Sequence, residues 1–183
     1  MKQNKQTELP FNIFLIGFMG AGKSTVASYM HRQYSMPLIE MDETLAEREC
    51  MTIPEIFAQK GESYFRQAET ELLKEIQTRS NVIISCGGGV AMRQENVEIM
   101  KKSGKVVLLT ASPDSILERV KNDENRPLLK GRKTAEGIQE LMDARRPFYE
   151  AAADLIIATD TQPLEDICEE IINRLRQMQP KNL

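Results

Sequence analysis

Short apolar runs alternate with longer amphipathic segments along the whole chain. The runs are rich in Val, Ile and Leu and nearly continuous in apolar character, which is typical of strands buried on both faces of a sheet. We therefore expect strands at residues 12–16, 37–41, 82–86, 105–110 and 155–158.

The segments between these runs carry apolar residues at the spacing of an amphipathic helix. A stripe of this kind packs one face of a helix on a core. The stripes are Val26, Met30 and Tyr34; Phe65, Ala68, Leu72 and Ile76; Ile116, Leu117 and Val120; Ile138, Leu141, Met142 and Arg145; and Leu164, Ile167, Ile171, Leu175 and Met178. Ser112 and Pro113 precede the third stripe as a helix cap and a first-turn proline. Strands that alternate with helices predict an α/β domain of three layers, in which helices cover both faces of a parallel sheet.

Two segments follow neither pattern. Residues 42–61 form a segment longer than a simple connection between two strands needs, and this segment mixes charged side chains with a few apolar ones. Residues 121–133 are mostly charged or polar and show no helical or strand periodicity. In an α/β enzyme such segments are usually loops or lids over a site, so we expect loops here. Most of these charges could equally belong to a solvated surface loop.

Size and charge narrow the picture. The chain has 183 residues, 41% of them hydrophobic, which corresponds to one globular domain with a core at about residues 11–178. Its 24 basic and 27 acidic residues leave a formal charge of −3, so we expect neither nucleic acid nor membrane as a partner. Three dispersed cysteines and one histidine argue against disulfides, zinc sites and most histidine-based triads, and they favour a cytoplasmic protein. The apolar stretch at 11–21 is interrupted by glycines and is not expected to be a signal peptide.

The most specific motif occupies residues 17–25, which read Gly-Phe-Met-Gly-Ala-Gly-Lys-Ser-Thr. It satisfies the pattern G-x-x-x-x-G-K-[ST], follows a predicted strand and opens a predicted helix, as a phosphate-binding loop requires. Glycine lets phosphate oxygens approach bare backbone amides, and the helix N-terminus adds its positive end. Lys23 can reach the β- and γ-phosphates, and the Ser24 hydroxyl can ligate Mg²⁺. We expect ATP to contact Gly20, Ala21, Gly22, Lys23, Ser24 and Thr25.

Further motifs follow the loop in a fixed order between about Asn12 and Ile172. They are Asp42, Gly61-Glu62, Phe65-Arg66 with Glu69, Gly87-Gly88-Gly89, Arg126-Pro127-Leu128-Leu129, and Arg145 ahead of Pro147 and Tyr149. In this order and at these intervals the series resembles shikimate kinase. The resemblance implies transfer of the γ-phosphoryl group of ATP to the 3-hydroxyl of shikimate. It also implies a nucleoside-monophosphate-kinase-like sheet with strand order 2-3-1-4-5, a substrate-binding segment at about 41–70 and a mobile lid at about 121–133.

The resemblance also implies roles for single residues. Arg66 and Arg145 correspond to the arginines that bind the substrate carboxylate, which suits the fork geometry of guanidinium groups. Asp42 corresponds to the aspartate that holds the ring hydroxyls, and it is the best candidate for accepting the proton of the attacking hydroxyl. The backbone of Gly87, Gly88 and Gly89 would lie against the substrate.

On the nucleotide side, the resemblance assigns Arg126 to the lid arginine that neutralises the transferring phosphoryl group. Together with Lys23 and Asp42 it completes the expected catalytic set. Arg119 matches the position of an arginine that packs on adenine; a solvated helix face is an equally good interpretation of it.

The metal site departs from the family's pattern. The family commonly has two aspartates where this chain reads Glu40-Met41-Asp42, and the first of them organises Mg²⁺ and its waters. Glutamate keeps the charge but extends the side chain by about 1.5 Å. We expect one Mg²⁺ ion bound to Ser24, with Glu40 and Ser85 contacting the water ligands of the ion. Slower turnover would be one consequence of the longer Glu40 side chain.

Plainer interpretations of these residues stay open. Arg66 and Glu69 are three residues apart and could form an ordinary surface pair, and the glycine triplet could be a plain turn. For the whole chain, the leading hypothesis is a monomeric shikimate kinase with ATP and shikimate as partners. The alternatives are a kinase for another small hydroxy acid or a nucleotide, and a nucleotide-binding regulatory module that has lost its chemistry, for which Glu40 is the only argument.

Overall fold

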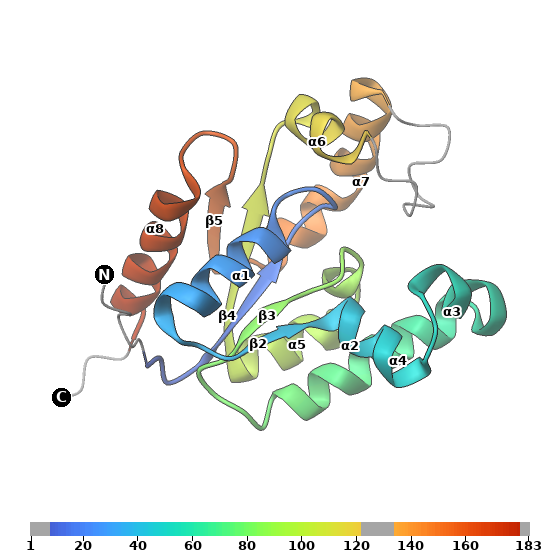
Figure 1. Ribbon diagram of the computed structural model, residues 1–183, viewed down its shortest axis with the longest axis horizontal. Helices are drawn as coiled ribbons and strands as arrows, with labels where there is room; N and C mark the ends of the chain where they lie inside the picture. The colour runs from blue at the N-terminus through green and yellow to red at the C-terminus, as the bar shows by residue number, and fades with distance from the viewer. Residues whose placement is uncertain (1–7, 122–133, 180–183) are drawn as a thin grey trace.

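The computed structural model describes residues 8–121 and 134–179. At its centre lies a five-stranded parallel sheet with helices on both faces (Figure 1). The strands are β1 (Asn12–Ile16), β2 (Leu38–Glu40), β3 (Ile83–Ser85), β4 (Gly104–Thr110) and β5 (Leu155–Ala158). They follow the order β2-β3-β1-β4-β5, which confirms the predicted fold class and strand order.

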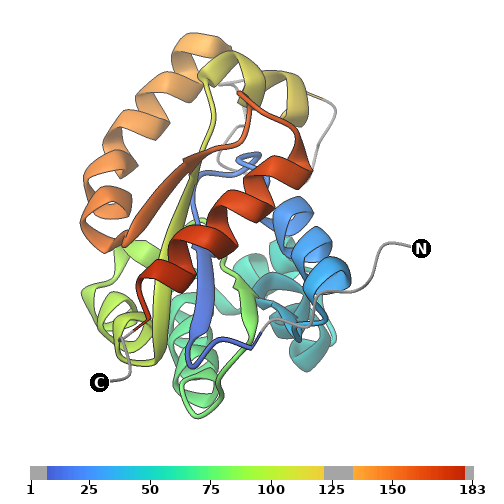
Figure 2. The same cartoon turned by 90° about the vertical axis from the view of Figure 1, so that its left-hand side faces the viewer.

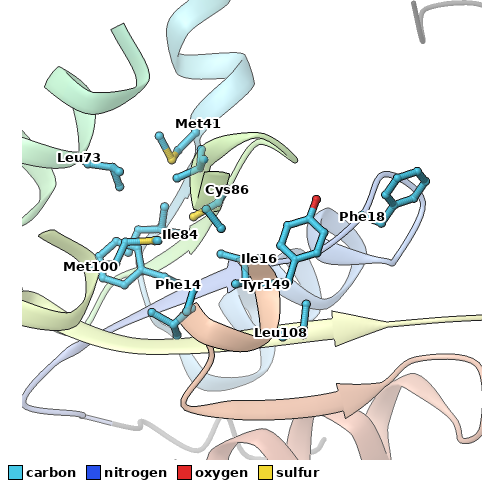
Figure 3. Close-up of a cluster of buried hydrophobic side chains, with 14 of the residues drawn as sticks. Phe14, Ile16, Phe18, Met41, Leu73, Ile84, Cys86, Met100, Leu108 and Tyr149 are labelled. Atoms are coloured by element: carbon cyan, nitrogen blue, oxygen red, sulfur yellow. The ribbon is translucent and has the colours of Figure 1, made fainter. Parts of the chain in front are cut away.

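The two faces of the sheet are covered by different helices. Alternate residues of a strand point to opposite faces, so Ile13 and Leu15 of β1 are buried on one side and Phe14 and Ile16 on the other. The first side packs on α1 (Lys23–Tyr34) and α8 (Leu164–Gln177), which lie side by side in Figure 2. The second side packs mainly on the remaining helices, and Figure 3 shows Phe14 and Ile16 within this larger cluster.

The remaining helices differ widely in length. They are α2 (Met41–Glu49), α3 (Ile53–Lys60), α4 (Glu62–Ile76), the short 3₁₀ helix η1 (Val90–Met92), α5 (Gln94–Ser103), α6 (Pro113–Val120) and α7 (Ala135–Ala152). The five predicted stripes lie in α1, α4, α6, α7 and α8, except that Met178 of the last stripe follows α8 and is exposed. Ser112 caps α6 as expected. Among the described residues, no helix is both long enough and apolar enough to cross a membrane.

The expectation of a loop at residues 42–61 is wrong, because this segment folds into most of α2 and all of α3. Thr52 and Glu55 form a reciprocal capping box at the start of α3, in which the Thr52 hydroxyl accepts from Glu55 N and Glu55 accepts from Thr52 N. This arrangement satisfies donors that the first turn of a helix leaves open. The apolar stripes of both helices are short, with Met41, Leu45 and Ile56 as their fully buried members, so periodicity alone missed them.

Helix α5 was missed for a related reason. Its sequence carries charged residues at both ends, and its buried apolar residues are Val97, Ile99 and Met100. Asn96 is fully buried as well, because its amide donates to Val90 O and its oxygen accepts from the Thr70 hydroxyl. A polar residue at a core position hides the stripe when helices are predicted from apolar spacing.

Parallel strands place their carboxyl ends at one edge of the sheet. The segments that leave β1, β2, β3 and β5 at this edge are residues 17–22, the start of α2, Gly87–Gly89 and Thr159. In open α/β sheets, ligands bind at this edge where the strand order reverses. The topology thus brings together segments that are up to about 140 residues apart in the chain, as the bond from the Thr159 hydroxyl to Ala21 O shows.

Candidate active site

The phosphate loop joins β1 to α1 and depends on glycine geometry. Gly17 has φ 145°, and a Cβ atom built on it would collide with Leu109 O of β4. Gly22 has φ 99° and occupies the N-cap of α1, which therefore begins without a capping side chain and without an acidic residue in its first turn. The positive end of α1 is thus left for an anion from outside the helix.

Lys23 is folded back over this loop. Its ammonium group donates to Gly17 O at 2.9 Å and to Phe18 O at 3.1 Å. The carbonyl oxygens hold the charge at the start of α1, beside the backbone amides of the loop. A phosphate group on those amides would lie within reach of the same ammonium group.

Side-chain oxygen atoms that could ligate a metal ion lie next to Lys23. The Ser24 hydroxyl donates to Glu40 Oε2 at 3.1 Å and lies 3.5 Å from the Ser85 hydroxyl. Burial at the end of β2 raises the pKa of Glu40, and hydrogen bonds from Ser85 and Ser24 oppose this effect. Hydroxyl and carboxylate oxygens suit Mg²⁺, so these residues fit the expected ion.

Within the described residues, no group of three or more acidic, histidine or cysteine side chains could hold a metal by itself. At nucleotide sites, Mg²⁺ usually completes its coordination with phosphate and water oxygens. The longer Glu40 side chain still reaches Ser24, so the replacement of aspartate does not separate the two groups.

The glycine segment after β3 lies between acidic and basic side chains. A Cβ atom on Gly87 would lie 2.8 Å from both Asp42 Oδ1 and Glu69 Oε1, and one on Gly89 would collide with the guanidinium group of Arg66. These glycines do more than form a turn, because any side chain would displace the groups around them. The structure therefore brings Asp42 and Arg66 together at this segment.

Arg66 and Glu69 do not form an ordinary surface pair. Glu69 is fully buried in α4, and its Oε2 accepts from Arg66 Nη1 at 2.8 Å. Arg66 also contacts Glu62 at 3.2 Å, and its guanidinium carbon lies 5.5 Å and 5.8 Å from the ring centroids of Phe65 and Phe57. Burial raises the pKa of Glu69 to about 7, although the positive charge of Arg66 lowers it.

Arg145 approaches the same glycine segment from α7. Its Nη1 donates to Gly88 O at 3.5 Å, and the guanidinium carbon lies 5.9 Å from the ring centroid of Phe18 in the phosphate loop. Tyr149, one turn further along α7, donates its hydroxyl to Gly88 O at 2.7 Å and is almost fully buried. The two arginines assigned to the substrate carboxylate thus reach one short segment from different helices.

Arg119 is exposed on α6, and its guanidinium group is nevertheless hydrogen-bonded to neighbouring segments. Its guanidinium group donates to Gly20 O at 2.9 Å, to the Thr159 hydroxyl at 3.1 Å and to Thr159 O at 3.1 Å. The Thr159 hydroxyl in turn donates to Ala21 O at 2.7 Å. Arg119 and Thr159 therefore connect the phosphate loop to the end of β5, and contact with adenine stays a prediction.

The remaining expected residues can be placed only in part. Arg126 and nearly all of the predicted lid lie outside the described residues. Sequence reasoning assigned no role to Glu69, Tyr149 or Thr159, although the first two belong to the recognised motifs. All three are buried; Glu69 and Tyr149 adjoin Gly87–Gly89, whereas Thr159 contacts the phosphate loop. Neither burial nor these contacts can be read from residue type or spacing.

Comparisons with known proteins agree with this geometry. The sequence model of the shikimate kinase family matches residues 19–176. A shikimate kinase of Dehalococcoides mccartyi is 39% identical over 166 residues, which cover 91% of this chain and 94% of the relative. One of Thermodesulfovibrio yellowstonii is 40% identical over 167 residues, or 91% of this chain and 96% of that protein.

Solved structures give the same result. Shikimate kinase from Acinetobacter baumannii in complex with shikimate has a TM-score of 0.87 and 32% identity, with 95% of this chain and 97% of that chain covered. Shikimate kinase from Aquifex aeolicus has a TM-score of 0.75 and 37% identity, with 91% and 97% covered. The family model and the curated relatives match nearly the full length of the sequence, and the solved structures share its fold. This chain therefore belongs to the shikimate kinase family.

Proposed function

We propose that this chain transfers the γ-phosphoryl group of ATP to the 3-hydroxyl of shikimate, giving shikimate 3-phosphate and ADP. One observation carries the proposal. Asp42, Arg66 and Arg145 surround Gly87–Gly89 at the same sheet edge as the phosphate loop. This places groups suited to a carboxylated polyol beside groups suited to a triphosphate.

On the acceptor side, Arg66 and Arg145 bind the carboxylate of shikimate through charged hydrogen bonds. Both lie close enough to Gly88 and Gly89 for one substrate to contact the two guanidinium groups and the glycine backbone. Asp42 accepts hydrogen bonds from the ring hydroxyls. As the 3-hydroxyl oxygen attacks, its proton passes to the Asp42 carboxylate.

On the nucleotide side, the amides of residues 20–25 hold the phosphates and Lys23 balances the charge on the transferring group. Ser24 and Glu40 would hold Mg²⁺, which when bound supplies further neutralisation of the phosphate charge. Arg126, which lies outside the described residues, is proposed to add a second cation. Positioning and electrostatics account for most of the rate acceleration in such a site.

The organisation around the site is part of the proposal. The chain would act as a single kinase domain, in the cytoplasm and as a monomer, with no nucleic acid or membrane partner. Residues 41–70, which span α2, α3 and half of α4, would bind the substrate. Residues 121–133 would form a lid that excludes water during transfer.

A coupled assay for ADP formation, with and without shikimate, tests the function. We expect ADP formation from ATP to rise strongly when shikimate is added. Activity only with a different hydroxy acid or a nucleotide would favour another acceptor. Nucleotide binding without turnover would favour a regulatory module; the contact between Glu40 and Ser24 argues against this outcome.

A further inference from the structure

Glu69 is a buried carboxyl group with an incomplete set of partners. None of its surface is exposed, and Oε1 has no hydrogen-bond partner, whereas Oε2 is paired with Arg66. An ionised carboxylate in such a place loses hydration that one arginine replaces only in part. Glu69 is therefore balanced between its charged and its neutral form, as its pKa of about 7 reflects.

The charged and titratable groups around Glu69 come from several elements. Arg66 and Glu62 lie on its own helix, Asp42 on α2 and Arg93 immediately before α5. Arg93 donates to Arg66 O and to the Thr70 hydroxyl, both at 3.2 Å.

Two further groups adjoin this cluster. The thiol of Cys86, after β3, is fully buried and its pKa is raised by burial, so it stays neutral. On α7, Arg145 and Tyr149 contact Gly88. Among the described residues, Arg66 is the one cation that donates a hydrogen bond to Glu69.

We propose that Glu69 takes up a proton from solvent when shikimate binds, and that this buried carboxyl group thereby adjusts the charge of the pocket that receives the substrate carboxylate. The inference rests on the proposed role of Arg66. A carboxylate bound to Arg66 adds a negative charge near Glu69 and competes for the same guanidinium group. Both effects favour the neutral form of Glu69 in the complex.

The position of Oε1 supports this exchange. It faces the same space beside Gly87 as Asp42 Oδ1, since both atoms lie 2.8 Å from the position of a Cβ on that glycine. A protonated Glu69 becomes a hydrogen-bond donor and no longer repels Asp42. Asp42 can then stay ionised, as a group that accepts the proton of the attacking hydroxyl must.

The direction of the pH dependence follows from linkage. The pKa of Glu69 is about 7 in the free protein and higher in the complex, so shikimate binds most tightly below pH 7. As the pH rises through 7, protonation accompanies binding, and the affinity falls by up to about tenfold per pH unit. The decline ends above the pKa that Glu69 has in the complex.

Isothermal titration calorimetry of the full chain with shikimate measures the number of protons taken up on binding. Binding heats at pH 8 in HEPES and in Tris differ by the difference between the ionisation heats of the two buffers, multiplied by the number of protons taken up. If the pKa of Glu69 rises by one unit in the complex, we expect about 0.4 proton per shikimate at pH 8 and close to none at pH 5.5. A wild-type protein that binds shikimate at pH 8 with no proton uptake would overturn the inference.

Two variants locate the proton. Glu69→Gln keeps the shape of the neutral form, so we expect it to bind shikimate with little proton uptake and with an affinity nearly independent of pH. Glu62→Gln is the matched control, because it removes an exposed partner of Arg66 from the same helix and should keep the wild-type uptake. Uptake retained in folded Glu69→Gln, or loss of shikimate binding by it, would contradict the inference.

If Glu69→Gln does not fold, the wild-type protein can still overturn the inference, because shikimate binding at pH 8 without proton uptake contradicts it. Failure of the proposed function would give a different result. A wild-type protein that binds ATP but no shikimate at any pH would contradict the proposed function, whereas binding without a proton contradicts only the role of Glu69.

Discussion

The nucleotide side and the acceptor side of this site are built in different ways. The nucleotide side is centred on nine adjacent residues, 17–25, whose backbone amides and one ammonium group are proposed to hold the phosphates. The acceptor side consists of Asp42, Arg66, Glu69 and Arg145 around Gly87–Gly89, drawn from three helices and one loop. A local motif can form the first side, and only packing can form the second.

The two sides also differ in their electrostatics. Lys23 donates to two carbonyl oxygens of its own loop, which are close to it in sequence. Arg66 is held by Glu69, a carboxyl group whose pKa is raised to about 7 by burial. Substitutions on the nucleotide side should therefore impair transfer to any acceptor, and those on the acceptor side should act on shikimate alone.

Removing the ammonium group of the phosphate loop tests the first half of this contrast and should give the largest effect. We expect Lys23→Ala to lower kcat by about 10³-fold at saturating substrates, because the charge on the transferring phosphoryl group loses a fixed cation. Steady-state ADP formation measures it. Lys102→Ala, at an exposed position of α5, is the control, and a wild-type rate in Lys23→Ala would refute the assignment.

Removing the guanidinium group on the acceptor side should separate the two sides. We expect Arg66→Ala to raise the KM for shikimate by about 10²-fold or to abolish turnover, because charged hydrogen bonds are lost, while ATP binding stays intact. Arg48→Ala, which removes an exposed arginine paired with Glu75 in α4, is the matched control. Equal loss of ATP affinity in Arg66→Ala would show that the sides are not separable.

A smaller change tests the support of the glycine segment. Tyr149→Phe removes the hydroxyl that donates to Gly88 O and leaves the ring in the core. We expect the KM for shikimate to rise by about three- to tenfold with the KM for ATP unchanged, since a neutral hydrogen bond contributes about 1 kcal/mol. A larger change in the KM for ATP than in that for shikimate would argue against this placement.

The smallest effect is expected from a substitution at the proposed Mg²⁺ site. Glu40→Asp restores the residue that is usual in the family and shortens the side chain that contacts Ser24. We expect the Mg²⁺ concentration for half-maximal activity to change by about two- to tenfold, because the charge is kept and only the geometry changes. Activity titrated with Mg²⁺ measures it, and an unchanged Mg²⁺ dependence would exclude a role of Glu40 at the ion.

Particular elements show how far the sequence could lead. The strands are predicted closely because short, continuous apolar runs between helical patterns are typical of parallel strands buried on both faces. Helices α2, α3 and α5 were missed because their apolar stripes are short and, in α5, interrupted by the buried Asn96. The capping box at Thr52 was visible in the sequence and would have indicated α3.

The sequence alone determined the phosphate loop, because its function resides in backbone amides and in one cation that are adjacent in the chain. The ordered motifs also indicated the family, which the comparisons confirm, and led to the proposed roles of Asp42, Arg66 and Arg145. Tertiary structure decided the burial of Glu69, the contact of Tyr149 with Gly88 and the attachment of Arg119 to the phosphate loop. These properties depend on which helices cover which strand ends, and the protonation of a carboxyl group depends on the surrounding solvent and charge, which no local pattern of residues records.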